Sequence, residues 1–363
     1  MARRKAFARF PHSFFCEITL CMRKLTVYGI FILIAMMAPS AARASAHSVP
    51  YTALGDSYSA GEGNDPFDSS CHRAEHADSA YPRILPSLVG YISLPNFHAC
   101  TGAVIADIWR RHQPNMPGQS TQTTYVRPSD RLVTLTVGGN DLRFSTILRE
   151  CLLHSDCTES APAKADDVDL TTIEPKLVNT YAQVRARMNP AGYLVVGGYP
   201  HLFASGAEAG CNPLISPKES AWIDNLVDRG NARIAAAVRA ARLRSANVFY
   251  VDVTGDFAGH ELCSDEPWLY SLKLSLHEGH NLLQGSYHPT PAGQAAYAAA
   301  FSRFLNRPAV RSALTARRSP RSACSASSPG PGNWSRAPAR RGARPAHWSA
   351  RARACRPAGG ARP

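Results

Sequence analysis

Two residues far apart in the chain are of the types that together cleave esters. Ser57 follows a short apolar run in Gly55-Asp-Ser-Tyr-Ser-Ala-Gly, and His288 lies in Ser286-Tyr-His-Pro-Thr. A serine hydroxyl is a weak nucleophile that needs an adjacent base, and histidine is the usual base because it titrates near neutral pH. We therefore predict that Ser57 and His288 meet in the folded protein as nucleophile and base.

Two further segments offer hydrogen-bond donors for a tetrahedral intermediate. Gly102 opens a helix-like segment, and Asn140 lies in Gly138-Gly-Asn-Asp. The developing oxyanion of acyl transfer needs N–H groups aimed at it in advance. We predict an oxyanion hole made of the Ser57 and Gly102 backbone N–H groups and the Asn140 side-chain amide.

Three aspartates are conceivable third members of a catalytic triad. They are Asp56, Asp141 and Asp252. Aspartates beside turns and helix starts more often accept backbone N–H groups than act in catalysis. We expect bracing or capping roles for all three.

The elements that must position these residues alternate along the chain. Apolar runs predict strands at 51–54, 92–98, 132–137, 194–196 and 248–253, and helical patterns cover 79–89, 102–111, 170–188, 217–244 and 291–305. This alternation favours parallel βαβ units whose strands are covered on both faces. We predict one domain at about 48–307, a three-layer α/β/α sandwich with a central parallel sheet. Since the carboxyl ends of parallel strands share one edge, the four segments can converge there.

The net charge of +13 over 363 residues is concentrated at the two ends. Residues 1–46 carry +6 and residues 308–363 carry +12, whereas residues 47–307 have 21 basic and 26 acidic side chains, a net charge of −5. A strongly basic domain would favour an anionic partner such as nucleic acid. The mildly acidic central part gives no reason to expect one.

The two ends differ from the central part in composition as well. Residues 1–46 contain the three parts of a secretory signal peptide: a basic pair at Arg23-Lys24, an apolar run at 27–38 and a small-residue cleavage site at Ala44-Ser-Ala. The alternative is an uncleaved N-terminal anchor, and Met22 is a possible true start. Residues 308–363 are rich in Arg, Ala, Pro, Ser and Gly, so we expect either a disordered tail or a misread end of the gene.

Export would place the cysteines in an oxidising compartment. Six lie in the central part, which allows fifteen pairings, and only the short loop between Cys151 and Cys157 favours a particular pair. Metal binding is not indicated, because no Cys-x-x-Cys spacing occurs there and His277-Glu-Gly-His280 is one residue too short for a zinc helix motif.

Together these segments resemble the SGNH (GDSL-type) hydrolase superfamily. The matching residues are Gly55-Asp-Ser57, Gly102, Gly139-Asn-Asp141 and His288, and longer stretches such as Ala99-Cys-Thr-Gly-Ala and Phe257-Ala-Gly-His-Glu-Leu-Cys are similar to secreted lipases and esterases of actinomycetes. The resemblance covers about 51–305. It implies a flavodoxin-like fold, no metal or other cofactor, and the disulfides Cys71–Cys100, Cys151–Cys157 and Cys211–Cys263.

The sequence departs from the superfamily pattern at one position. Many members have an aspartate three residues before the histidine, and here that position is Gly285. Some actinomycete lipases replace this acid with a main-chain carbonyl, for which Ser286 is the candidate here. We therefore predict a Ser–His dyad in place of a triad.

We expect a secreted carboxylic ester hydrolase, most readily one that acts on lipid acyl esters, as a monomer with at most transient contact with a lipid surface. Two alternatives remain open: an acetyl esterase of polysaccharides on the same site, and a catalytically silent surface-binding protein. Trp268, Tyr270, Leu272, Leu274 and Leu276 fit an acyl-binding groove and a core segment equally well.

Overall fold

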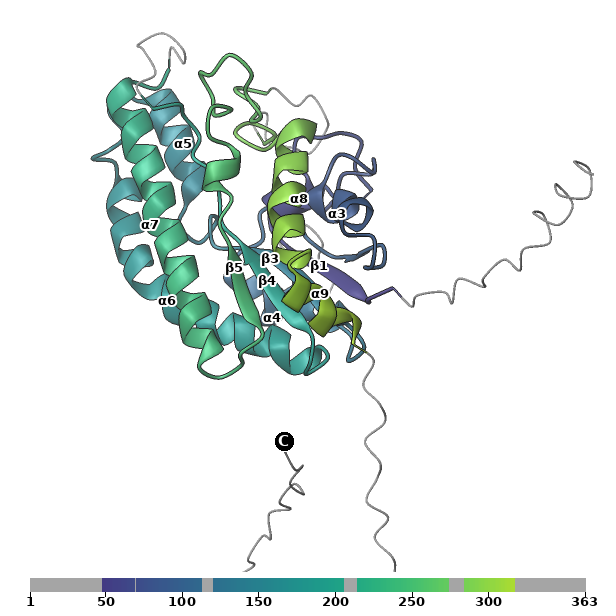
Figure 1. Ribbon diagram of the computed structural model, residues 1–363. Helices are drawn as coiled ribbons and strands as arrows, with labels where there is room; N and C mark the ends of the chain where they lie inside the picture. The colour runs from purple at the N-terminus through teal and green to yellow at the C-terminus, as the bar shows by residue number, and fades with distance from the viewer. Residues whose placement is uncertain (1–47, 69, 113–119, 206–213, 274–283, 317–363) are drawn as a thin grey trace, which may run out of the picture. The chain divides into compact units, whose positions relative to one another are not determined.

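A single parallel sheet organises the chain. The computed structural model describes residues 48–68, 70–112, 120–205, 214–273 and 284–316 (Figure 1). Within them the sheet has five parallel strands in the order β2-β1-β3-β4-β5. The strands are β1 (Tyr51–Gly55), β2 (Asn96–Phe97), β3 (Leu132–Thr136), β4 (Tyr193–Gly197) and β5 (Val248–Val251).

The two central strands are buried along their whole length. β1 and β3 pair from Tyr51 opposite Leu132 to Gly55 opposite Thr136. Their apolar side chains meet helices on both faces, as expected for strands of a parallel sheet. The polar side chains among them find partners: the Tyr51 hydroxyl lies 2.8 Å from the Thr134 hydroxyl, and the Thr52 hydroxyl donates to Asp130 at 2.7 Å. These polar groups are therefore hydrogen-bonded although they are buried.

Helices cover the two faces of the sheet (Figure 1). One layer contains α3 (Tyr81–Val89), α8 (Pro291–Leu305) and α9 (Pro308–Thr315). The other contains α4 (Ile105–Trp109), α5 (Phe144–Leu153), α6 (Ala161–Arg187) and α7 (Pro217–Arg242). The predicted three-layer α/β/α sandwich is therefore confirmed.

Local sequence signals account for the helix starts. Ser216 and Glu219 form a capping box at α7, and the Thr290 hydroxyl accepts the Gly293 N–H at the start of α8, where proline occupies the first position. In the layer of α3 and α8, the Tyr81 ring stacks on Phe301 with ring centroids 4.8 Å apart. Helix α8 thus begins directly after the loop that carries His288 and packs on one face of the sheet.

Two helical features were not predicted. Helix α5 was missed, and α6 begins at Ala161 instead of residue 170 and continues through Pro175. The first ten residues of α6 bury only Ala163, Asp166 and Leu170, so their apolar periodicity is weak. α5 is short and is held by the Cys151–Cys157 disulfide beyond its last turn.

Regular structure extends past residue 307, the approximate end predicted for the domain. The chain continues into α9, where Val310 and Leu314, one turn apart, are buried in the main core. Arg131 ties the end of this helix to the sheet by donating to the Ala313 and Ala316 carbonyls at 2.8 and 2.7 Å. The two apolar side chains on one face bury this helix against the core. The Arg-rich and Ala-rich composition of the segment did not indicate such a helix.

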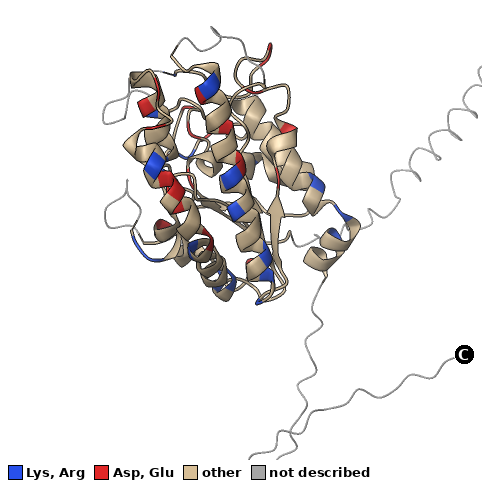
Figure 2. Ribbon diagram, turned by 90° about the vertical axis from the view of Figure 1, so that its left-hand side faces the viewer, with Lys and Arg blue, Asp and Glu red and all other residues tan. Residues whose placement is uncertain are grey.

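The predicted signal peptide region and residues 317–363 lie outside the described residues. Within the described part no helix is long and apolar enough to cross a membrane. Basic and acidic positions are interspersed along the helices in the view of Figure 2. Pairs such as Arg229 with Asp167 and Arg233 with Glu174 link α7 to α6.

The burial of α9 can be tested by truncating its core side chain. Leu314→Ala is expected to lower the free energy of unfolding by about 2–5 kcal/mol, because Leu314 has no exposed surface and its loss leaves a cavity. Urea denaturation measures the change. Leu243→Ala is the control, since Leu243 is 90% exposed and should change stability by less than about 0.5 kcal/mol. Equal stability of both variants would show that α9 does not belong to the domain.

Candidate active site

The predicted site residues gather at the carboxyl edge of the sheet. Ser57 begins the one-turn helix α2 (Ser57–Ala60) directly after β1, and Asn140 follows β3. Strand β1 lies between β2 and β3, so successive connections leave it in opposite directions. Such a switch point opens a crevice in which α/β proteins bind ligands.

The predicted nucleophile and the predicted base are in hydrogen-bond contact. His288 Nε2 lies 2.8 Å from Ser57 Oγ, and His288 Nδ1 lies 2.9 Å from the Ser286 carbonyl oxygen. A carbonyl can only accept, so Nδ1 carries the proton and Nε2 is free to accept from the serine hydroxyl. This is the tautomer that a general base toward Ser57 requires.

Tyrosines hold the histidine loop in place. The Tyr58 hydroxyl donates to the Tyr287 carbonyl at 2.8 Å, and the Tyr270 N–H donates to the His288 carbonyl at 2.9 Å. Tyr287 itself has φ 62°, a left-handed conformation that the loop adopts between Ser286 and His288. The turn in the backbone brings the Ser286 carbonyl back to the imidazole of His288.

Asp56 braces the serine and does not touch His288. Its carboxylate accepts from the Tyr58 N–H at 3.1 Å, the Thr136 hydroxyl at 2.8 Å and the Tyr199 hydroxyl at 2.5 Å. Burial raises the pKa of Asp56 to about 6, although these hydrogen bonds oppose the rise. The predicted capping role is confirmed, and Tyr199, which sequence reasoning missed, joins β4 to this cluster.

The other two aspartates also have backbone-capping roles, as expected. Asp141 accepts the Ile105 N–H at 2.9 Å at the start of α4, and Asp252 accepts the Thr254 N–H at 2.9 Å. A further brace was missed: the Gln122 side-chain amide accepts the Gly55 N–H at 2.7 Å and donates to the Gly55 carbonyl at 2.8 Å. These bonds fix the backbone immediately before Asp56 and Ser57.

The three predicted oxyanion donors border one crevice. Ser57 is the first residue of α2, so its N–H is not used inside the helix. Gly102 is exposed at φ 74°, which a glycine adopts without strain. The Asn140 amide donates one N–H to the Ala103 carbonyl at 3.0 Å, which orients its second N–H. All three residues line the same cavity as His288.

The cavity has a volume of about 480 Å³, and apolar side chains of two helices form one side of it. Leu148 and Leu152 come from α5, and Leu226, Val227 and Ile234 come from α7. The described residues of the predicted acyl-binding segment pack elsewhere: the Trp268 ring stacks on His260 with centroids 3.5 Å apart, and the Tyr270 hydroxyl donates to Asn64. Leu274 and Leu276 lie outside the described residues.

Two of the three predicted disulfides are confirmed, Cys71–Cys100 and Cys151–Cys157. Cys263 is disulfide-bonded, and its predicted partner Cys211 lies outside the described residues. The Cys71–Cys100 bond anchors the loop that leads to Gly102.

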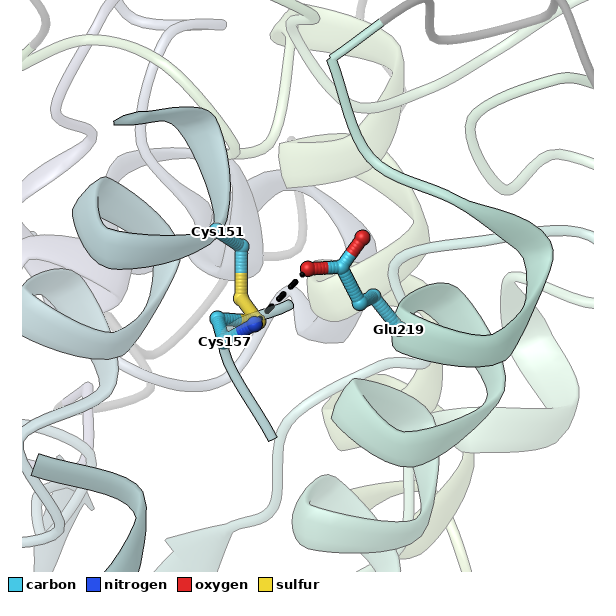
Figure 3. Close-up of side chains that lie close together, drawn as sticks. All are labelled: Cys151, Cys157 and Glu219. Atoms are coloured by element: carbon cyan, nitrogen blue, oxygen red, sulfur yellow. Dashed lines mark hydrogen bonds between the residues drawn. A yellow bond between two sulfur atoms is a disulfide. The ribbon is translucent and has the colours of Figure 1, made fainter. Parts of the chain in front are cut away.

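The Cys151–Cys157 disulfide lies next to Glu219, whose carboxylate accepts the Cys157 N–H at 3.0 Å (Figure 3). Although these three side chains lie close together, sulfurs joined in a disulfide are not thiolate ligands for a metal. The pair His277 and His280 lies outside the described residues.

Burial sets the titration of the base. It lowers the pKa of His288 below the ordinary 6.5, while the charge of Glu62 and the Ser286 and Gly285 backbone act to raise it. The imidazole is therefore neutral, and able to accept a proton, at neutral pH.

In this site a serine hydroxyl is bonded to a neutral imidazole, and N–H donors lie beside it in the crevice. Serine ester hydrolases use this arrangement to form an acyl-serine and to stabilise the oxyanion. Residues 53–296 match the family model of the GDSL-like lipase/acylhydrolase family. The chain belongs to this family, and it is a carboxylic ester hydrolase.

Named relatives agree with this assignment. A lipase of Streptomyces rimosus is 35% identical over 246 residues, which cover 67% of this chain and 82% of the relative, and Lipase 1 of Streptomyces coelicolor is 33% identical with the same coverage. The crystal structure of the extracellular lipase from Streptomyces rimosus matches with a TM-score of 0.57 and 31% identity, covering 71% of this chain and 99% of that one. Phospholipase A1 from Streptomyces albidoflavus matches with a TM-score of 0.56 and 30% identity, covering 71% and 98%.

The pH dependence of activity follows from the buried imidazole. Activity requires the neutral form, so kcat/KM should rise with pH through the pKa of His288 and be halved at a pH below the ordinary 6.5. The measurement is a pH profile of kcat/KM with a soluble nitrophenyl ester. Circular dichroism at each pH separates loss of the base from unfolding. An acid limb at or above 6.5 in the folded protein would contradict the interpretation.

Proposed function

We propose that the protein is a secreted, monomeric hydrolase of lipid acyl esters that works through a Ser57–His288 dyad. The observation that carries this proposal is the 2.8 Å contact between Ser57 Oγ and His288 Nε2 at the wall of a partly apolar cavity. The disulfides and the extracellular relative support secretion.

In the proposed mechanism Ser57 Oγ attacks the ester carbonyl carbon while His288 Nε2 takes its proton. The N–H groups of Ser57 and Gly102 and the Asn140 amide stabilise the oxyanion. His288 then gives the proton to the leaving alcohol, and an acyl-serine remains. Water, deprotonated by the same imidazole, attacks the acyl group and releases the acid and the free Ser57 hydroxyl.

The Ser286 carbonyl does the orienting work that an aspartate does in a triad. It holds Nδ1–H at 2.9 Å and thereby keeps Nε2 directed at Ser57. A neutral carbonyl stabilises the imidazolium less than a carboxylate would, because it carries only a partial charge.

The lining of the cavity favours an acyl chain as the group next to the scissile bond. Aliphatic side chains of α5 and α7 face the space beside Ser57 and Asn140. Burial of apolar surface contributes about 25 cal/mol per Å², so a long chain gains affinity there, whereas an acetyl group has little surface to bury. This favours lipid esters over the acetylated polysaccharides that the same dyad could attack.

The nucleophile can be tested by removal and by labelling. Ser57→Ala should abolish hydrolysis of nitrophenyl butyrate, because within the described residues Ser57 supplies the hydroxyl that is bonded to His288, while circular dichroism stays unchanged. A fluorophosphonate should label the parent protein and fail to label the variant. Ser59→Ala is the matched control, since Ser59 lies on the same helix turn but bonds Tyr81 and Thr136 instead. Labelling or turnover retained by Ser57→Ala would overturn the assignment.

The acyl site can be tested at a glycine of α7 that lines the cavity. In Gly230→Leu the new side chain enters the cavity, where its Cβ would lie 3.0 Å from the flexible end of Leu142. We expect kcat/KM for a twelve-carbon nitrophenyl ester to fall by about tenfold relative to the four-carbon ester, since lost apolar burial weakens binding of the longer chain. Ala232→Leu, exposed on the same helix, is the control and should leave this ratio unchanged. An unchanged ratio in Gly230→Leu would place the acyl chain elsewhere.

A further inference from the structure

Glu62 is a buried carboxylate close behind the nucleophile. It is 2% exposed, and its N–H donates to the Ser57 carbonyl at 3.1 Å, one turn after that residue. His72 Nδ1 lies 2.8 Å from one carboxylate oxygen, and the Gly63 N–H donates to the other at 3.2 Å. The His72 ring is itself fixed, because it stacks on Phe67 with centroids 4.5 Å apart. Burying a charged carboxylate is energetically unfavourable unless it is paired and hydrogen-bonded, so a structural or functional role is expected for Glu62.

The segment around Glu62 lies against the loop that carries His288. A Cβ added to Gly285 would lie 3.2 Å from the Gly63 Cα atom, so the two backbones are in contact. Gln284, which lines the cavity with Ser57 and His288, places its Nε2 atom 3.5 Å from Glu62 Oε2. Glu62 is therefore adjacent to the catalytic loop without reaching the reacting atoms.

The ionisation of Glu62 fits this position. Burial acts to raise the pKa of its carboxyl, but hydrogen bonds from His72 and Thr101 and the nearby charges of His288 and His72 outweigh burial, so the pKa lies below its ordinary value. In return the Glu62 charge acts to raise the pKa of His288, although the effect of burial is larger and the pKa stays below its ordinary value. The carboxylate is thus charged at neutral pH and acts electrostatically on the imidazole.

This charge is what the dyad lacks. During attack His288 becomes an imidazolium in a buried site, where an unpaired charge is costly. The Ser286 carbonyl orients the ring but carries no net charge, and at Gly285 there is no side chain. We propose that Glu62 is the positioning residue that stabilises the imidazolium of His288 through space, and so replaces the missing aspartate electrostatically. The proposal rests on the dyad described under the proposed function.

Other charged groups near the site have different orientations. The Asp56 carboxylate is bonded to Tyr58, Thr136 and Tyr199. The Lys273 ammonium faces the Gly63 carbonyl and Asp65. Among the described residues, it is the charge of Glu62 that acts to raise the pKa of His288 against the effect of burial.

The test removes the charge and keeps the shape. In Glu62→Gln we expect kcat for nitrophenyl butyrate to fall by roughly tenfold to a hundredfold with KM little changed, because the charge acts on the transition state, and less directly than an oxyanion donor does. The acid limb of kcat/KM should also move to lower pH, since the neutral imidazole loses its anionic neighbour. A role that is only structural would not move this limb.

Two variants complete the design. Glu62→Asp restores a carboxylate, so its acid limb should return toward that of the parent protein, even though its shorter side chain alters the contact with His72. Glu75→Gln removes an exposed carboxylate of the same segment and should leave kcat and the acid limb unchanged.

The outcomes separate this inference from the proposed function. If Ser57→Ala is inactive and Glu62→Gln keeps the parent kcat and acid limb, the dyad stands and the role of Glu62 is refuted. If Glu62→Gln and Glu62→Asp lose activity equally with unmoved limbs, Glu62 is structural and the proposal is also refuted. Activity retained by Ser57→Ala would instead refute the dyad itself.

Discussion

The hydrogen bond between Ser57 Oγ and His288 Nε2 joins residues that are 231 positions apart in the chain. It forms because both residues leave regular structure at one edge of the sheet, one just after β1 and the other just before α8. The geometry of this bond depends on the residues that fix the two backbone segments. Gln122 and Asp56 hold the serine side, and Tyr58 and Tyr270 hold the histidine side.

The absence of a carboxylate before His288 changes how the two tasks of a third member are performed. Orientation is assigned to the Ser286 carbonyl, which fixes the tautomer at 2.9 Å. We propose that charge compensation comes from Glu62 on the other side of the loop. Asp56, the acid nearest in sequence to the nucleophile, has its carboxylate committed to Tyr58, Thr136 and Tyr199 and serves as a scaffold.

The same edge of the sheet also bears the cavity in which we propose that the substrate binds. The crevice at the switch point is widened by α5 and α7, whose aliphatic side chains lie beside Asn140 and Ser57. An apolar wall next to a polar reaction centre suits an ester with a long acyl chain, since the chain gains from burial while the carbonyl meets fixed donors. The Cys151–Cys157 disulfide at the end of α5 and the capping box at the start of α7 keep this wall in place.

The resemblance to a known family implied the two disulfides that the structure contains. The sequence by itself determined the α/β/α class and most strands and helices, and it predicted the pairing of Ser57 with His288 and the three oxyanion donors. These depend on apolar periodicity and on short motifs such as Gly55-Asp-Ser57, in which the signal is local. Only the tertiary structure decided the partly apolar cavity beside Ser57, the burial of α9 and the places of Gln122, Tyr199 and Glu62. Their roles come from contacts across tens to hundreds of residues, and a weakly amphipathic helix or a single polar side chain acquires its meaning only from what it packs against.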